Sequence, residues 1–273
     1  RTKLLDYVGK DSKWVECNKS NPDAIRAAEE LMGKGVKSAA GNHTNRARVY
    51  FSKAKNYPEG SKDYLDNLQK SRAEYQLALK GWRAFLANDP DADDAYDSKY
   101  WIADSLHKIV AVTNAMGEKL DRKQVKEARD AAVEVRDSNL EDKYLKYAAF
   151  FAVDVYDRLA DEGLEAYKKS GCLPSVGYEL VEDPTQEPGD ACIAESVKGM
   201  REEKRIWIRP IPEPIINKMK EREDYVANVP KSLDPENNAL RYRFQVADTL
   251  YSYGRWSEAT PRFEQIWREN CGK

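Results

Sequence analysis

Residues 239–271 constrain the fold more than any other part of the sequence, because they hold two helical periodicities joined by a turn at Gly254. Ala247 and Ala259 lie where the two helices would touch, and small residues there let helix backbones pack closely. Larger apolar residues flank both alanines at helical spacing: Val246, Leu250, Trp256, Phe263 and Ile266. Such a hairpin cannot bury its apolar face alone and must stack on a neighbour. The sequence therefore predicts an all-α fold of stacked helical hairpins, a type of structure that usually provides a binding surface.

Related spacings occur twice more in the chain. The three segments that carry them are Ala78-x3-Trp82 with Phe85 and Pro90, Ile102-Ala103-x2-Leu106, and Val246-Ala247-x2-Leu250 followed by Ala259-x3-Phe263. These spacings resemble the tetratricopeptide repeat family, and the resemblance implies an α-solenoid with a concave groove. The chain departs from the family at Lys99 and Arg243, where tryptophan is common, and at Cys271, where proline often closes a repeat.

Residues 83–107, RAFLANDPDADDAYDSKYWIADSLH, resemble one subgroup of that family. The subgroup consists of bacterial envelope proteins, such as outer-membrane assembly lipoproteins and periplasmic cell-division coordinators. The resemblance implies a periplasmic or outer-membrane-associated protein, and a cytoplasmic location is the alternative.

No segment alternates convincingly as a β-strand. We expect helical, tetratricopeptide-like repeats in residues 1–164, an irregular insertion with one helix in 165–214, and a truncated C-terminal repeat in 215–273. Within the first part, Gly33 and Gly35 are expected to interrupt a helix at 23–40, which stops at Gly41 before another helix at 43–57.

Cys172 and Cys192 bracket a segment of the insertion that is rich in proline and glycine. Closing such a loop removes unfolded-state entropy on the order of 3 kcal/mol, so a disulfide staple is predicted, with two unrelated thiols as the alternative. A disulfide would indicate an oxidising compartment. The sequence leaves the state of Cys17 and Cys271 open.

Composition narrows the classes of partner. The formal net charge of −2 gives no electrostatic reason to expect nucleic acid. The mean hydropathy is −0.80, and no apolar run approaches the roughly 18 residues that a membrane span requires. We therefore expect a protein or peptide partner and no transmembrane segment.

The first helix of each repeat would line the concave groove of such a stack. Candidate partner-binding residues are Tyr100, Trp101, Asp104, His107 and Lys108 in one repeat and Arg241, Phe244, Gln245, Asp248 and Tyr251 in the last. Aromatic and arginine side chains supply binding energy there, and the polar residues would orient a peptide. Alternatively, Trp101 and Phe244 pack as core, and Asp104, His107 and Lys108 are merely solvated.

The sequence gives catalysis little support. His43 is expected in a loop without a partner, and His107 lies one turn from Asp104. No set of nucleophile, base and orienting residue can be named, and neither a phosphate-binding loop nor coherent metal-ligand spacing occurs. We therefore expect no catalytic residues, no metal and no cofactor. The expected function is a non-catalytic adaptor; the alternatives are a structural helical subunit of a larger assembly and an all-α enzyme with a deep, carboxylate-lined cavity.

The helix expected at residues 256–270 carries four large apolar side chains: Trp256, Phe263, Ile266 and Trp267. The first two can pack inside their own hairpin, whereas Ile266 and Trp267 would be covered by a further repeat. We expect the chain to be a fragment or a processed form. We therefore also expect self-association through residues 256–271, because exposed apolar patches favour association.

Overall fold

A computed structural model of the chain describes residues 12–88, 90, 92–138, 140–170, 211 and 213–271, with the backbone alone for 161–170. These residues form nine α-helices and no strand, so the predicted all-α fold is confirmed for the described part of the chain. The chain divides into two compact units, Arg1–Tyr144 and Leu145–Lys273. The segment between Cys172 and Cys192 lies outside the described residues, whereas Cys17 and Cys271 are exposed free thiols.

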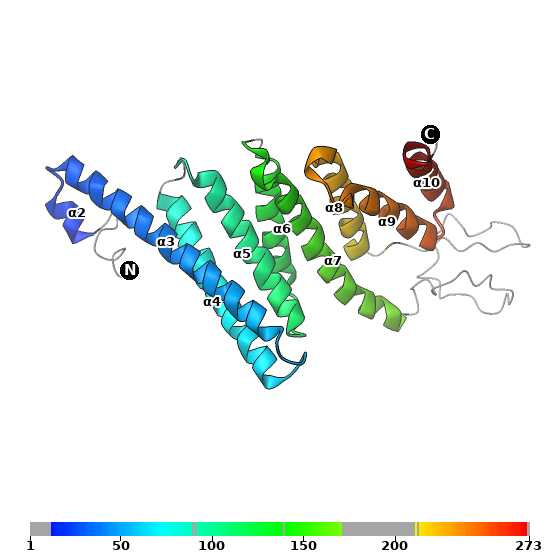
Figure 1. Ribbon diagram of the computed structural model, residues 1–273, viewed down its shortest axis with the longest axis horizontal. Helices are drawn as coiled ribbons and strands as arrows, with labels where there is room; N and C mark the ends of the chain where they lie inside the picture. Colours follow the sequence, from blue (N-terminus) through cyan, green and yellow to red (C-terminus); the bar gives the residue numbers. More distant parts are fainter. Residues whose placement is uncertain are drawn as a thin grey trace, which may run out of the picture. The chain divides into compact units, whose positions relative to one another are not determined.

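The first unit is a series of helices in which each long helix packs on the next in the chain (Figure 1). Its elements are α2 (Lys13–Cys17), α3 (Pro22–Ala54), α4 (Lys62–Asn88), α5 (Ala95–Ala115), α6 (Arg122–Arg136) and the 3-10 turn η1 (Asp142–Tyr144). Gly60 and Gly117, both with positive φ, form the turns after α3 and α5. Glycine adopts a positive φ without the steric cost that a Cβ causes, so the two glycines favour turns at these positions.

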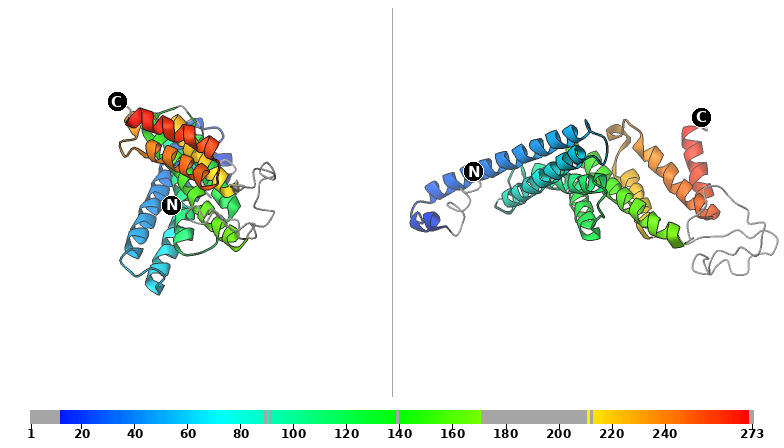
Figure 2. Two further views of the ribbon diagram at one scale, coloured as in Figure 1. Left: turned by 90° about the vertical axis from the view of Figure 1, so that its right-hand side faces the viewer. Right: turned by 90° about the horizontal axis from the view of Figure 1, so that it is seen from below.

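The helix α3 is continuous, so the expected interruption at Gly33 and Gly35 and the stop at Gly41 are wrong. A glycine inside a helix is less favourable than alanine by about 1 kcal/mol, which packing against another helix can offset. Here α3 lies along α4 (Figure 2). A Cβ at Gly81 of α4 would lie only 2.8 Å from the Cβ of Ala40, so the two helices touch backbone to backbone at this point. Tertiary packing therefore outweighs the local preference of the glycines.

The core of the first unit is formed by α3, α4 and α5 together. One cluster of buried residues consists of Ala47, Ala54, Leu68, Tyr75, Ile109 and Val112. A second contains Ala40, Ala78 and Trp82, with Trp101 and Ile102 packed against it. Ala78 and Trp82 of the predicted motif thus lie in the core, on the face of α4 that their spacing indicated.

The second unit contains α7 (Leu145–Ser170), α8 (Glu213–Asn228), the 3-10 turn η4 (Lys231–Leu233), α9 (Asn238–Ser252) and α10 (Trp256–Asn270). Contacts join α7 to α8, α8 to α9, and α9 to α10. The hairpin predicted around Gly254 is confirmed: Gly254 has φ of 74°, and the N–H of Arg255 donates to the carbonyl of Leu250 at 2.9 Å. Ala247 and Ala259, the predicted contact residues, are 0% and 1% exposed.

The start of α9 is fixed by the buried carboxylate of Asp234. It accepts hydrogen bonds from the N–H of Asn238 at 3.0 Å, from the N–H of Ala239 at 2.7 Å, and from the Tyr225 hydroxyl at 3.2 Å. Burial disfavours the charged carboxylate, but the donated hydrogen bonds outweigh it and lower the pKa of Asp234. Asp234 therefore caps α9 and ties it to α8 through Tyr225.

Lys99 and Arg243, which stand where tetratricopeptide repeats commonly have tryptophan, have the same structural role in each unit. Lys99 of α5 forms an ion pair with Glu134 of α6 at 2.9 Å. Arg243 of α9 forms an ion pair with Glu269 of α10. In both hairpins, an ion pair thus joins the two helices at this position.

Candidate partner-binding surface

The candidate residues on α5 lie largely inside the first unit. Tyr100, Asp104 and His107 are only 8%, 3% and 3% exposed, and Lys108 is half-buried. The ring of Tyr100 is stacked on the ring of Tyr144, with centroids 3.8 Å apart and planes inclined by 2°. These side chains therefore contribute to packing within the unit and do not form an open groove wall.

Arg48 of α3 organises the polar part of this packing. Its guanidinium lies 3.3 Å from the carboxylate of Asp104 and 5.1 Å from the centre of the Trp101 ring. The Trp101 ring is also stacked with the ring of Trp82, and the two ring centroids are 6.2 Å apart. Burial raises the pKa of Tyr75 to about 12, with a further contribution from the charge of Asp104, which Arg48 opposes. Trp101 thus follows the alternative reading, as part of the packing between α3, α4 and α5.

His43 has a partner that the sequence did not reveal. It lies within α3 and not in a loop, and its Nδ1 is 2.6 Å from a carboxylate oxygen of Glu74 on α4. Arg46 pairs with the other oxygen of Glu74 at 2.7 Å. The expected loop position of His43 was wrong because α3 continues through Gly41.

The candidate residues on α9 are accessible. Phe244 and Tyr251 are 51% and 41% exposed, Arg241 and Asp248 are also exposed, and Gln245 is half-buried. Arg241, Phe244, Asp248 and Tyr251 recur every three or four residues, so they share one side of the helix, which we call the α9 face. It offers two aromatic rings with a cation at one end and a carboxylate between the rings.

Two aromatic residues of α10 extend the α9 face. The ring of Phe263 lies 5.5 Å from Phe244 and 6.2 Å from Tyr251, with both pairs edge to face. Trp256 lies 6.3 Å from Tyr251 and donates its indole N–H to the backbone carbonyl of that residue at 3.2 Å. Phe263 and Trp256, which the sequence predicted inside the hairpin, are half-buried and contact the two exposed rings. Rings held in this way lose little conformational freedom when a partner binds, which is characteristic of residues that dominate interfaces.

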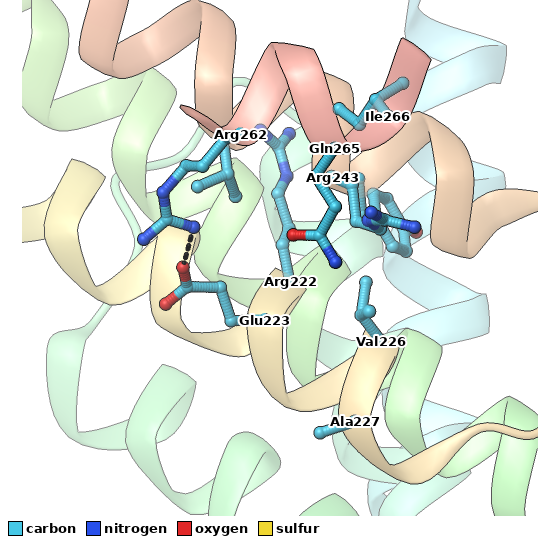
Figure 3. A pocket seen from close by; sticks show the side chains of 10 residues that line it. Arg222, Glu223, Val226, Ala227, Arg243, Arg262, Gln265 and Ile266 are labelled. Atoms are coloured by element: carbon cyan, nitrogen blue, oxygen red, sulfur yellow. Dashed lines mark hydrogen bonds and ion pairs between the residues drawn. The ribbon is translucent and has the colours of Figure 1, made fainter. Parts of the chain in front are cut away.

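A cavity of about 380 Å³ lies on the other side of α9, between α8 and α10 (Figure 3). Three arginines surround it, and each forms an ion pair with a carboxylate: Arg222 with Asp157 at 3.2 Å, Arg262 with Glu223 at 2.5 Å, and Arg243 with Glu269. The positive charge around the cavity is therefore largely balanced by neighbouring helices. No sequence motif indicates this cavity, because its arginines come from three different helices.

The end of α10 is exposed in part. Trp267 is 60% exposed, as predicted, whereas Ile266 is half-buried and lines the cavity. Across the described ranges, no helix is long and apolar enough to cross a membrane. The same residues contain no group of three or more histidine, cysteine or acidic side chains placed to hold a metal ion.

No protein-family model matches the chain, and neither a curated protein nor a solved structure is significantly similar to it. The resemblance to tetratricopeptide repeats therefore stays a prediction from the motifs.

Proposed function

We propose that the chain is a non-catalytic adaptor, built as a solenoid of tetratricopeptide-like hairpins, that recruits a protein partner through the α9 face. The observation that carries this proposal is the exposure of Phe244 and Tyr251, 51% and 41%, on a helix side that also bears Arg241 and Asp248. Two large rings in water represent apolar area whose burial is worth roughly 25 cal/mol per Å². A partner that covers both rings gains that free energy, while Arg241 and Asp248 give it orientation.

The proposed location is the bacterial envelope, in the periplasm or at the outer membrane. It rests on the resemblance of residues 83–107 to envelope proteins and on the cysteine pair that brackets the segment rich in proline and glycine within the insertion. An oxidising compartment and a disulfide between Cys172 and Cys192 would be consistent with each other.

Capture of partners from a native envelope extract tests the proposal. A partner bound by the unaltered chain should be lost with Phe244→Ala and with Tyr251→Ala, while circular dichroism shows an intact helical fold. Ile216→Ala is the matched control, because Ile216 is a large apolar residue of the same unit with a similar exposure of 50%. A partner that persists with both aromatic variants, or that is lost equally with Ile216→Ala, would contradict binding through the α9 face.

The second candidate is a structural helical subunit that associates through α10. The 60% exposure of Trp267 favours it, since a large ring at this exposure tends to become buried in a contact. This candidate predicts self-association and no separate partner.

A further inference from the structure

The helices α5 and α9 are equivalent elements of the two units. The motif residues Lys99, Ile102, Ala103 and Leu106 correspond in order and spacing to Arg243, Val246, Ala247 and Leu250. Ala103 and Ala247 are both fully buried, Leu106 and Leu250 are at most 3% exposed, and Lys99 and Arg243 both pair with a glutamate of the next helix. This correspondence allows the surroundings of the two helices to be compared position by position.

The largest differences in burial between the two helices lie along one side. Tyr100, Asp104 and His107 of α5, which are buried, correspond to Phe244, Asp248 and Tyr251 of the α9 face, which are exposed. The aromatic ring at the first of these positions and the aspartate at the second are retained. The α9 face thus has an aromatic ring and an aspartate at the same positions as the covered side of α5, although it is exposed among the described residues.

The segment that leads into α7 covers the first part of the equivalent side of α5, at Asp97 and Tyr100, whereas Arg48 of α3 pairs with Asp104 further along the helix. The segment that leads into α7 stacks Tyr144 on Tyr100, places the Nζ of Lys143 at 2.9 and 3.1 Å from the carboxylate oxygens of Asp97, and presents the carbonyl of Glu141 to the Tyr96 hydroxyl at 2.7 Å. Asp97 in turn raises the pKa of Lys143 by accepting its hydrogen bonds. The covering element is therefore the start of a helix with a basic residue directly before an aromatic one.

The charge at the equivalent position of α9 is reversed. Asp97, which accepts from Lys143, corresponds to Arg241, and Tyr100, which stacks on Tyr144, corresponds to Phe244. If a lysine occupied the position of Lys143 next to α9, the Arg241 guanidinium would repel it. A carboxylate at the same position would form an ion pair with Arg241. The aromatic contact is possible in both cases, so the residue before the ring decides between ligands.

We propose that the α9 face binds the start of a helix in a partner protein, where an acidic residue directly precedes an aromatic one. This rests on the proposed adaptor function and specifies the chemistry of its partner. The aromatic ring of the partner stacks on Phe244, and the acidic side chain pairs with Arg241. The Lys143-Tyr144 pair of a second copy of this chain is disfavoured, because its charge is opposite to the one that Arg241 requires.

The test uses the full chain and three helical peptides based on residues 141–156. They differ only at the pair that corresponds to Lys143-Tyr144, which is Glu-Tyr, Lys-Tyr or Glu-Ala. Isothermal titration calorimetry should show that the Glu-Tyr peptide binds about tenfold more tightly than the Lys-Tyr peptide. That factor corresponds to about 1.4 kcal/mol, the combined effect of a gained exposed ion pair and a removed like-charge contact. The Glu-Ala peptide should bind more weakly than the Glu-Tyr peptide, because it lacks the stacking ring.

Exchange of the charge on the chain provides the decisive control. Arg241→Asp should reverse the order of the Glu-Tyr and Lys-Tyr peptides, Phe244→Ala should abolish binding of both, and Ile216→Ala should leave all affinities unchanged. Equal affinity for the two peptides, a stronger affinity for Lys-Tyr, an order that Arg241→Asp does not change, or no binding at all would overturn the inference. If the extract experiment still shows a partner that depends on Phe244, the adaptor function stands and only the acidic-aromatic specificity fails.

Discussion

Replacement of Asp234 by alanine should strongly destabilise the second unit, because one carboxylate serves three donors. The side chain is 5% exposed and accepts from two N–H groups at the start of α9 and from the hydroxyl of Tyr225, which is 0% exposed. Loss of a helix-capping side chain costs about 1 kcal/mol, and a buried hydroxyl left without its partner costs a further 1–3 kcal/mol or so. The expected loss in the free energy of unfolding is therefore about 3 kcal/mol.

The effect should depend on pH in a defined direction. The pKa of Asp234 is lowered in the folded state, so the unfolded chain binds the proton more readily. The charged carboxylate therefore contributes its full stabilisation above the unfolded pKa of about 3.9, and loses it as the pH falls through the lower folded pKa. The gap between the unaltered chain and Asp234→Ala should be large at pH 7 and shrink below pH about 3.9.

Urea denaturation at pH 7 and at acidic pH, followed by circular dichroism, measures this gap. Hydrogen exchange of α9 amides locates the loss in the second unit. Asp234→Asn should lose less than Asp234→Ala, since an amide oxygen still accepts a hydrogen bond, and Asp248→Ala on exposed α9 should change stability by less than about 0.5 kcal/mol. A loss with Asp234→Ala below about 1 kcal/mol at pH 7, or a gap that stays constant into acid, would refute the capping argument.

Three further predictions concern other parts of the chain. Gly81→Ala should destabilise the first unit by about 1–3 kcal/mol, since its Cβ would lie 2.8 Å from a buried alanine Cβ of α3. Gly41→Ala, whose Cβ would meet nothing within 4 Å, should stabilise it by up to about 1 kcal/mol; thermal unfolding that ranks the two variants in the opposite order would contradict this packing. Thiol titration of the unfolded, unreduced chain should find two free thiols if Cys172 and Cys192 are joined, whereas four would refute the disulfide. Sedimentation under reducing conditions should show an oligomer that Trp267→Glu dissociates, and a monomer in both cases would count against association through α10.

Apolar periodicity and turn residues predicted those helices whose limits are set by interactions between nearby residues. The hairpin of α9 and α10 follows from the periodicity around Ala247 and Ala259 and from a glycine that can adopt the positive φ of the turn. The continuity of α3 could not be predicted in this way. The helix α3 packs closely on α4, where Ala40 meets Gly81. The helix propensities of Gly33, Gly35 and Gly41 give no information about this long-range contact.

The sequence predicted which candidate residues share one side of a helix, but it did not predict whether that side is exposed. The same spacing that selects Phe244, Asp248 and Tyr251 on α9 selects Tyr100, Asp104 and His107 on α5, and only the neighbouring helices make the first set exposed and the second buried. Asp104 is covered by Arg48, a partner 56 residues away. The partner of His43 is likewise 31 residues distant, on another helix. Pairings of this range arise from the stacking of hairpins and leave no signal in the periodicity of a single helix.

The stacked pair of Trp82 and Trp101 gives the first unit an optical signature of its own. Two indole rings with centroids 6.2 Å apart and planes inclined by 19° couple their electronic transitions, which produces a circular dichroism band that depends on their fixed geometry. Trp267, by contrast, is 60% exposed and should emit fluorescence typical of an indole in water. Circular dichroism of the indole pair can therefore report on the folding of the first unit, and the fluorescence that is lost on Trp267→Phe can report on events at α10.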